Sequence, residues 1–274
     1  MSYADRRMKH MIESILTGYS DVGMNVRPKW DDGTPAHTLS QFGIVNRYDL
    51  QKEFPITTLR RTAFKSAIDE ILWIWQKKSN NTKDLNSKIW DSWADESGSI
   101  GAAYGHQLSI KHQYSEGEFD QVDRVLYDLK HNASSRRIIT DIYVHQDLHK
   151  MNLYPCVHHT QWIVKDGKLN LLIKQRSSDL LVANNWNVVQ YAVLQHMFAQ
   201  VSGLEVGELV HVIGDCHIYD RHIEGAREML KRKPLPAPKF KMNKEITNFY
   251  DFTVDDFELE GYKTHEQLRF EVAI

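Results

Sequence analysis

Apolar residues recur at helical spacing in three stretches of the chain, which predicts helices over residues 3–17, 61–77 and 188–201. The first two stretches have a single apolar face, so we expect each helix to pack along one side. The third is apolar nearly all round, as a central buried helix would be. Gly18 and Gly203 follow the first and third stretches, in the position where glycine commonly ends a helix.

Alternating or β-branched apolar runs predict strands at residues 138–144, 161–164, 169–174, 208–213 and 252–262. The second and third runs flank Lys165-Asp166-Gly167, a sequence typical of a tight hairpin turn. No internal repeat, low-complexity tract or shift in composition divides the chain. We therefore expect a single α+β domain over residues 1–274, in which helices cover a mixed sheet around the long central helix.

The composition is that of an ordinary globular protein, with 42% hydrophobic and 26% charged residues. A formal net charge of −2 gives no general attraction to DNA or to an anionic membrane, so an anion would need a local arginine cluster. The sequence contains no apolar run typical of a signal peptide or a membrane span. Two cysteines, Cys156 and Cys216, favour a reduced cytoplasmic setting over a disulfide framework.

Cys156 is the candidate nucleophile. The predicted hairpin returns Arg176 toward it, and a neighbouring positive charge stabilises a thiolate. Arg27 lies in a long loop, and Arg136 and Arg137 stand at the entrance of a predicted strand. Because alternate strand residues face opposite sides, the last two can serve one anion only through a bend or a second subunit. These arginines together indicate a phosphate site.

Some of these residues could also form two other kinds of site. A zinc site would draw on the cysteines and nearby histidines: Cys156, His158, His159, Cys216 and His217. Against it, neither cysteine has a Cys-x-x-Cys partner, and adjacent histidines of a strand point to opposite faces. A cysteine hydrolase could combine Cys156 with His217 and Asn187, and sequence order alone does not exclude it. The surplus of arginines favours attack on a phosphorylated small molecule instead.

Several motifs occur in one order along the chain: Glu70-Ile-Leu-Trp, Ile89-Trp90-Asp-Ser-Trp93, Ser135-Arg136-Arg137, Tyr154-Pro-Cys156, Gln175-Arg176-Ser-Ser-Asp179, Asn187 and Gly214-Asp-Cys-His217-Ile-Tyr219. In this combination the chain resembles the folate-dependent thymidylate synthases over nearly its whole length. The resemblance implies reductive methylation of dUMP at C5, with 5,10-methylenetetrahydrofolate supplying the carbon and the hydride and no metal taking part. It also implies an obligate homodimer whose sheets pack across the interface.

The resemblance assigns a role to each part of the site. Cys156 would add to C6 of uracil, and Arg176 would lower the pKa of the thiol. The phosphate would be bound by Arg27, Arg176, Ser177 and, from the partner subunit, Arg136 and Arg137. Asn187 would accept the N3 hydrogen and donate to O4, which prefers uracil over cytosine.

The remaining assignments concern the sugar, proton transfer and the folate. His217 and Tyr219 would bond the 3′-hydroxyl, and Glu70 would organise water for proton transfer. Asp179 would bond the pterin ring and take part in catalysis. Tyr104 would take part in catalysis, and Gln175, Ser178 and Asp179 would contact the substrate. The folate would be bound by Trp90, Trp93, Leu153, Trp186 and Ala273. Ile274 would help to close the site.

Three departures from the family pattern bear on the folate side of the pocket. Val157 stands where many members carry histidine, and Ala63 where a folate-contacting histidine is common. The usual Gly-Leu-Pro-Phe-Asn reads Ala183-Asn184-Asn185-Trp186-Asn187. A related alternative is a dUMP hydroxymethylase, in which water captures the methylene. Trp90 and Leu153 argue against water entry. An alternative of another class is a non-catalytic nucleotide- or RNA-binding relative.

Overall fold

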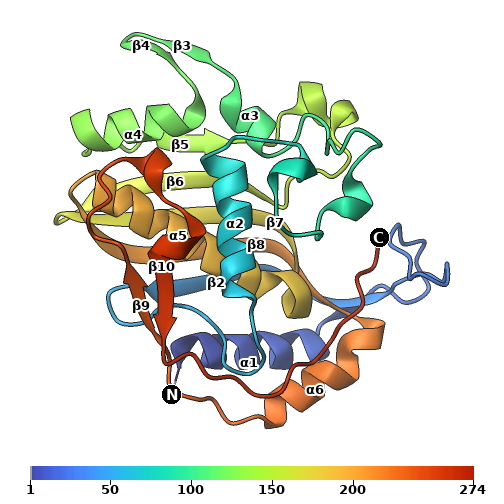
Figure 1. The fold of residues 1–274 in the computed structure, drawn as a ribbon. Coiled ribbons are helices and arrows are strands. Elements are labelled where there is room, and N and C mark those ends of the chain that lie inside the picture. The colour runs from blue at the N-terminus through green and yellow to red at the C-terminus, as the bar shows by residue number, and fades with distance from the viewer. Residues whose placement is uncertain (1) are drawn as a thin grey trace.

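A six-stranded mixed sheet organises the chain in the computed structural model, which describes residues 2–274 (Figure 1). Its strands are β1 (Tyr19–Ser20), β2 (Thr38–Asp49), β5 (Ile138–Asp141), β6 (Val157–Lys165), β7 (Lys168–Asp179) and β8 (Glu205–Tyr219). Their order is β1-β2-β8-β7-β6-β5. Neighbours are antiparallel except β7 and β8, which run parallel. The carboxyl ends of these two long strands therefore meet at one edge of the sheet.

The helices are α1 (Tyr3–Leu16), α2 (Phe64–Trp75), α3 (Gly105–Ser109), α4 (Gln121–His131), α5 (Asn185–Val201) and α6 (Ile223–Lys231). In Figure 1, α2 and α5 lie in front of the sheet, α1 and α6 lie below, and α3 and α4 lie at the top near β5. Helix α5 packs on β7 and β8, and α2 packs on α5, so the larger of two hydrophobic cores surrounds α5. The smaller core lies between α1, α6 and the sheet. Two short hairpins, β3 (His112–Tyr114) with β4 (Gly117–Phe119) and β9 (Lys239–Met242) with β10 (Phe257–Glu260), lie outside the main sheet.

The three predicted helices are present as α1, α2 and α5, and the prediction of a mixed α+β fold around a buried central helix is confirmed. The hairpin prediction is also confirmed, since Lys165 pairs with Lys168. Asp166 and Gly167 both have positive φ, 48° and 72°, as a two-residue turn of this hand requires. The hairpin brings the Cys156 end of β6 beside the Arg176 end of β7.

The strands predicted at 161–164, 169–174 and 208–213 are present but are shorter than the observed β6, β7 and β8. The other two strand predictions were too long. The strand predicted at 138–144 ends at Asp141, because its partner β6 begins only at Val157 and carries a bulge between Val157 and His159. The strand predicted at 252–262 is reduced to β10. The residues before it form 3₁₀ turns, because the side chains of Asn248 and Thr253 hydrogen-bond the backbone and favour a turn over an extended chain.

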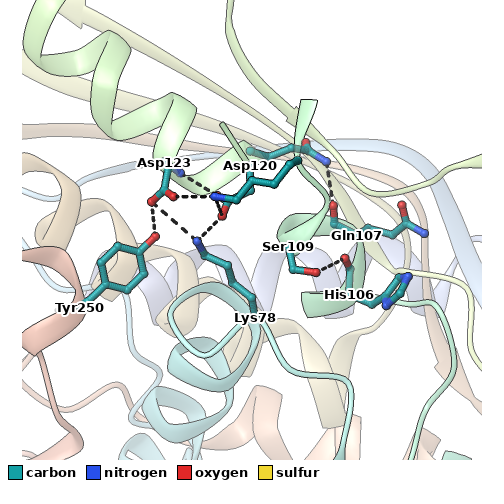
Figure 2. Close-up of polar contacts among 9 residues, drawn as sticks. Lys78, His106, Gln107, Ser109, Asp120, Asp123 and Tyr250 are labelled. Carbon is teal, nitrogen blue, oxygen red and sulfur yellow. Dashed lines mark hydrogen bonds and ion pairs between the residues drawn. The ribbon is translucent and has the colours of Figure 1, made fainter. Parts of the chain in front are cut away.

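A polar cluster near the β5 edge of the sheet ties distant segments together (Figure 2). We call Lys78, Lys111, Asp120, Asp123 and Tyr250 the Lys78 cluster. Lys78 Nζ lies 2.6 Å from Asp120, and Lys111 Nζ lies 3.3 Å from the same carboxylate. The Tyr250 hydroxyl donates to Asp123, and its ring lies under the Lys78 ammonium at 4.9 Å. The cluster therefore joins the end of α2 to α4 and to the C-terminal third of the chain.

Among residues 2–274, the structure has no helix whose length and apolarity would let it span a membrane.

Candidate active site

Cys156 lies immediately before β6, and Arg176 of β7 lies beside it. The Arg176 backbone N–H donates to the Cys156 carbonyl at 2.9 Å, and the Arg176 Nη2 lies 3.8 Å from the Cys156 sulfur. The guanidinium is held in place because it also donates to the carbonyls of Pro155 and Tyr154 at 3.0 and 2.8 Å. Arg176 forms no ion pair with a carboxylate among residues 2–274. Its charge is thus directed at the thiol.

The ionisation of Cys156 reflects opposing influences. Burial raises the pKa of the thiol above its usual value, whereas the charge of Arg176 and the Tyr104 hydroxyl lower it, and the net shift is upward. Arg176 acts in the direction predicted from sequence, but it does not outweigh burial. The Tyr104 hydroxyl also accepts a hydrogen bond from the Cys156 N–H at 3.0 Å. Tyr104 itself has a positive φ of 48°, a strained conformation for a residue with a side chain.

Asn187, in the first turn of α5, has its amide oriented by two glutamines. Its Oδ1 accepts from Gln175 Nε2 at 3.1 Å, and its Nδ2 donates to Gln190 Oε1 at 3.1 Å. Gln175 Oε1 in turn accepts from His211 Nε2 at 2.8 Å. Burial lowers the pKa of His211 to about 3, so this imidazole is neutral. Because the Gln175 oxygen accepts from His211, the Gln175 amide nitrogen faces Asn187. The Asn187 atom that accepts from this nitrogen must therefore be its oxygen.

Sequence reasoning missed Gln190 and His211 as parts of the site. A signal for each was present: Gln190 is a polar residue in a helix that is apolar nearly all round, and His211 stands between two valines of a strand. Both are buried, and a buried polar side chain needs a partner. What the sequence did not contain is the identity of that partner.

Glu70, on α2, is buried beneath the same end of α5. Trp186 Nε1 donates to Glu70 Oε2 at 2.8 Å, so the tryptophan expected to contact folate is bonded to this carboxylate. Burial raises the pKa of Glu70 to about 7. Trp90 packs on Tyr104 and on Trp93 with ring centroids 5.0 and 5.7 Å apart, which forms an aromatic cluster next to the Cys156 region.

His217 and Tyr219 occupy the carboxyl end of β8, where the register places His217 opposite Asp179 of β7. The His217 Nδ1 lies 2.7 Å from the Asp215 carboxylate, and the His217 and Tyr219 rings meet edge to face at 5.1 Å. Arg27 is exposed in its loop, near enough for its charge to act on the ionisation of Tyr219. The predicted 3′-hydroxyl pair and Arg27 therefore lie on the same side of the molecule.

Asp179 ends β7 and begins a short π-helical segment, Leu180–Asn184, that leads into α5. Its carboxylate accepts hydrogen bonds from the N–H groups of Leu181 and Val182 at 3.0 and 3.1 Å. Ser178 is buried and accepts from Asn184 Nδ2 at 3.2 Å, while Ser177 is half-buried. The departure from the usual loop sequence is thus accommodated by a turn that Asp179 caps.

The C-terminal residues and the Arg27 loop lie together (Figure 1). Ile274 and Lys29 exchange two backbone hydrogen bonds of 2.8 and 3.0 Å, which places Ala273 and Ile274 beside this loop. Leu153 and Trp93 are half-buried against the larger core. Ala63 is exposed just before α2, and Val157 is buried one residue after Cys156. In this chain the two positions where histidine is common in the family therefore carry aliphatic side chains.

Arg136 and Arg137 are the predicted site residues that the structure does not bring to Cys156. Both are exposed immediately before β5. The next residue, Ile138, pairs with Trp162, which lies six positions beyond Cys156 on β6. At ~3.3 Å per residue, this separation along the strand is about 20 Å. The two arginines of one chain are thus far from the thiol of the same chain.

The alternative sites find no support in the geometry. Within residues 2–274, the structure holds no group of three or more His, Cys, Asp or Glu side chains placed to bind a metal ion. Both cysteines are free thiols, and Cys216 is fully buried. The polar side chains that act on the ionisation of Cys156 are Arg176, Tyr104 and Glu70, whereas the His217 Nδ1 is bonded to Asp215. A cysteine–histidine pair of the hydrolase kind is not formed in this part of the chain.

Comparison with known proteins agrees with this arrangement. The family model described as thymidylate synthase matches residues 9–274. Thymidylate synthase of Bacillus licheniformis is 51% identical over 280 residues, covering 100% of both chains. Thymidylate synthase 1 of Bacillus subtilis strain 168 is 49% identical with the same coverage. The solved structure of thermostable thymidylate synthase A from Bacillus subtilis superposes with a TM-score of 0.96 at 48% identity over 100% of both chains.

Family match, identity and superposition each span essentially the whole chain, and they agree with the motif order that the sequence shows. The chain therefore belongs to the thymidylate synthase family and has that family's methyltransferase activity.

Proposed function

We propose that the chain methylates dUMP at C5 to give dTMP, with 5,10-methylenetetrahydrofolate as the source of the carbon and the hydride. The observation that carries this proposal is the Cys156 thiol held 3.8 Å from the Arg176 guanidinium. An oriented Asn187 and a buried Glu70 on neighbouring elements support it. Each group has a task in the reaction, and each task follows from its contacts.

Cys156 is the nucleophile in this proposal. C5 of uracil is a poor nucleophile until a thiolate adds at C6, which moves an electron pair toward O4 and forms an enolate that is reactive at C5. Arg176 is the nearest positive charge, so it stabilises the sulfur as a thiolate. The Tyr104 hydroxyl, bonded to the Cys156 N–H, fixes the backbone from which the sulfur projects.

Asn187 reads the base. Uracil presents an N–H donor at N3 and an acceptor at O4, and a carboxamide can pair with both. Cytosine presents the opposite pattern at these positions. The His211–Gln175 chain holds the Asn187 amide in one orientation, which supports discrimination by a preset amide rather than by one that turns to fit.

Arg27, Arg176 and Ser177 bind the phosphate together with Arg136 and Arg137 of the partner subunit. Support for a shared pocket comes from the separation of about 20 Å along β6 between these arginines and their own thiol. The outer face of the sheet also carries exposed apolar side chains, among them Val45 at 49% and Ile139 at 40%. A second copy of the chain would cover such a face.

Mixing two variant chains tests the shared pocket. Neither Cys156→Ala nor Arg137→Ala forms a complete pocket alone, whereas a mixed dimer contains one pocket with an intact cysteine and an intact arginine. After the subunits are unfolded together and refolded, random pairing should restore about a quarter of the wild-type activity. Activity no greater than that of the separate variants would contradict donation of Arg137 across the interface.

On the folate side, Asp179 bonds the pterin ring, and Trp90, Trp93, Leu153, Trp186 and Ala273 line the slot, with Ile274 closing it. The co-substrate supplies a one-carbon unit and a hydride when it is bound. Glu70 organises proton transfer at O4 and on the folate, a role that suits a buried carboxylate with a pKa of about 7. Exclusion of water by Trp90 and Leu153 favours hydride over hydroxide at the methylene.

Identification of both products tests the reaction. Incubation with dUMP and methylenetetrahydrofolate should yield dTMP and dihydrofolate in equal amounts by mass spectrometry. Recovery of 5-hydroxymethyl-dUMP with tetrahydrofolate would identify the enzyme as a hydroxymethylase instead. Retention of dUMP without any product would indicate a binding protein.

A further inference from the structure

Three side-chain N–H groups surround the Glu70 carboxylate, and only one of them makes a hydrogen bond within residues 2–274. Gln190, Trp186 and Trp90 all act to lower the pKa of Glu70, against the larger effect of burial. Trp186 Nε1 makes the hydrogen bond, at 2.8 Å to Oε2. The Gln190 amide nitrogen and the Trp90 indole nitrogen are buried without a partner at hydrogen-bond geometry in residues 2–274.

The bond from Trp186 crosses between two helices. Glu70 lies on α2 and Trp186 in the first turn of α5, 116 positions later in the chain. Trp186 is also the residue immediately before Asn187, so the contact holds the carboxylate in register with the amide proposed to read the base. A phenylalanine, the usual residue at this position in the family, has no N–H to donate.

We propose that Trp186 is a positioning residue for the reaction, whose indole N–H fixes one Glu70 oxygen and thereby orients the carboxylate for proton transfer. The inference rests on the proposed role of Glu70. A donor on Oε2 leaves Oε1 available for proton transfer, and it also favours the ionised carboxylate. Trp186 thus sets both the direction and the proton affinity of Glu70.

The test is the pH dependence of kcat in Trp186→Phe, which keeps an aromatic ring and removes the donor. Loss of one hydrogen bond to the carboxylate should shift the ionisation due to Glu70 upward by about one pH unit. The KM for dUMP should stay within about twofold of the wild-type value, because the carboxylate acts on the chemical step rather than on binding. Equilibrium binding of dUMP verifies that the variant is folded.

Two further variants separate the possible results. Trp162→Phe removes an indole N–H that donates to Thr160 in the core, so it should lower stability and leave the pH profile unchanged. Glu70→Gln should lower kcat and abolish the ionisation. If Glu70→Gln does so while Trp186→Phe matches the wild-type profile, the positioning role is overturned and the role of Glu70 stands. If Glu70→Gln retains full kcat and the same profile, the proposed function of Glu70 fails, and the inference fails with it.

Discussion

Two polar regions of this protein, the Lys78 cluster and the site around Cys156, differ in how their charged side chains are paired. In the Lys78 cluster the carboxylates of Asp120 and Asp123 both face lysines, and the Tyr250 hydroxyl completes the arrangement (Figure 2). In the site around Cys156, Arg176 donates to backbone carbonyls and faces the thiol. Arg176 has no carboxylate partner within residues 2–274.

The pKa values reflect the same difference. Burial acts to raise the pKa of Asp120, but hydrogen bonds from the Asp123 N–H and from Lys78 outweigh it, and the net shift is downward. For Glu70 the balance is reversed, because burial outweighs its donors. A polar group satisfied within the protein stabilises the fold, whereas one left short of partners is available to a ligand at a cost in stability. The comparison makes predictions for both regions.

The largest expected effect is the loss of the nucleophile. Cys156→Ala should lower turnover by at least about 10⁴-fold, because no other group can form the bond to C6. Binding of dUMP, measured by calorimetry, should persist since the arginines remain. The matched control is Cys216→Ala, which changes a thiol buried in the smaller core and should keep its activity. Near-normal turnover in Cys156→Ala would exclude covalent catalysis by this residue.

The next effect concerns the choice of base. Asn187→Asp replaces a fixed amide with a carboxyl group that can donate to N3 of cytosine when protonated, so dCMP should compete with dUMP. The ratio of kcat/KM values for dUMP and dCMP should change by about 10³-fold. Steady-state kinetics with each nucleotide measure it. An unchanged ratio would mean that Asn187 does not read the base.

Removal of one partner from the Lys78 cluster should affect stability alone. Asp120→Asn leaves Lys78, which is 13% exposed, without its nearest counter-charge and should lower the free energy of unfolding by about 4 kcal/mol. Urea unfolding gives this value, and kcat should be unchanged at a temperature where the variant is folded. Glu118→Gln, an exposed change on the nearby β4 hairpin, is the control. A fall in kcat in folded Asp120→Asn would show that the Lys78 cluster affects catalysis as well as stability.

The smallest effect is a cost in stability at the site itself. The pKa of Glu70 is about 7 in the folded protein and 4.5 as its ordinary value, so the folded state holds a proton that the unfolded chain releases between these pH values. The stabilising contribution is complete below about pH 4.5 and is lost as the pH rises through about 7. Glu70→Gln cannot ionise, so its gain in unfolding free energy over the wild type should be about 3 kcal/mol larger at pH 8 than at pH 4. Urea titrations of both proteins at the two pH values measure this difference. An equal effect of the substitution at pH 4 and pH 8 would show that the ionised Glu70 carboxylate does not destabilise the fold.

The sequence by itself determined the local elements and the family. Helical periodicity located α1, α2 and α5, and Lys165-Asp166-Gly167 located the hairpin, because both depend on residues close together in the chain. Cys156 and Arg176 could be paired from sequence for the same reason, since the hairpin between them fixes their register. Motif order was enough to identify the family.

Only the tertiary structure decided which side chains of the site hydrogen-bond one another. The bond between Trp186 and Glu70 depends on the packing of α2 against α5, and the one between His211 and Gln175 on the parallel pairing of β7 with β8. Periodicity shows that such residues are buried but not which distant side chain they meet. Burial also reversed the expected direction for the Cys156 pKa, because the cost of desolvating a charge depends on everything packed around it.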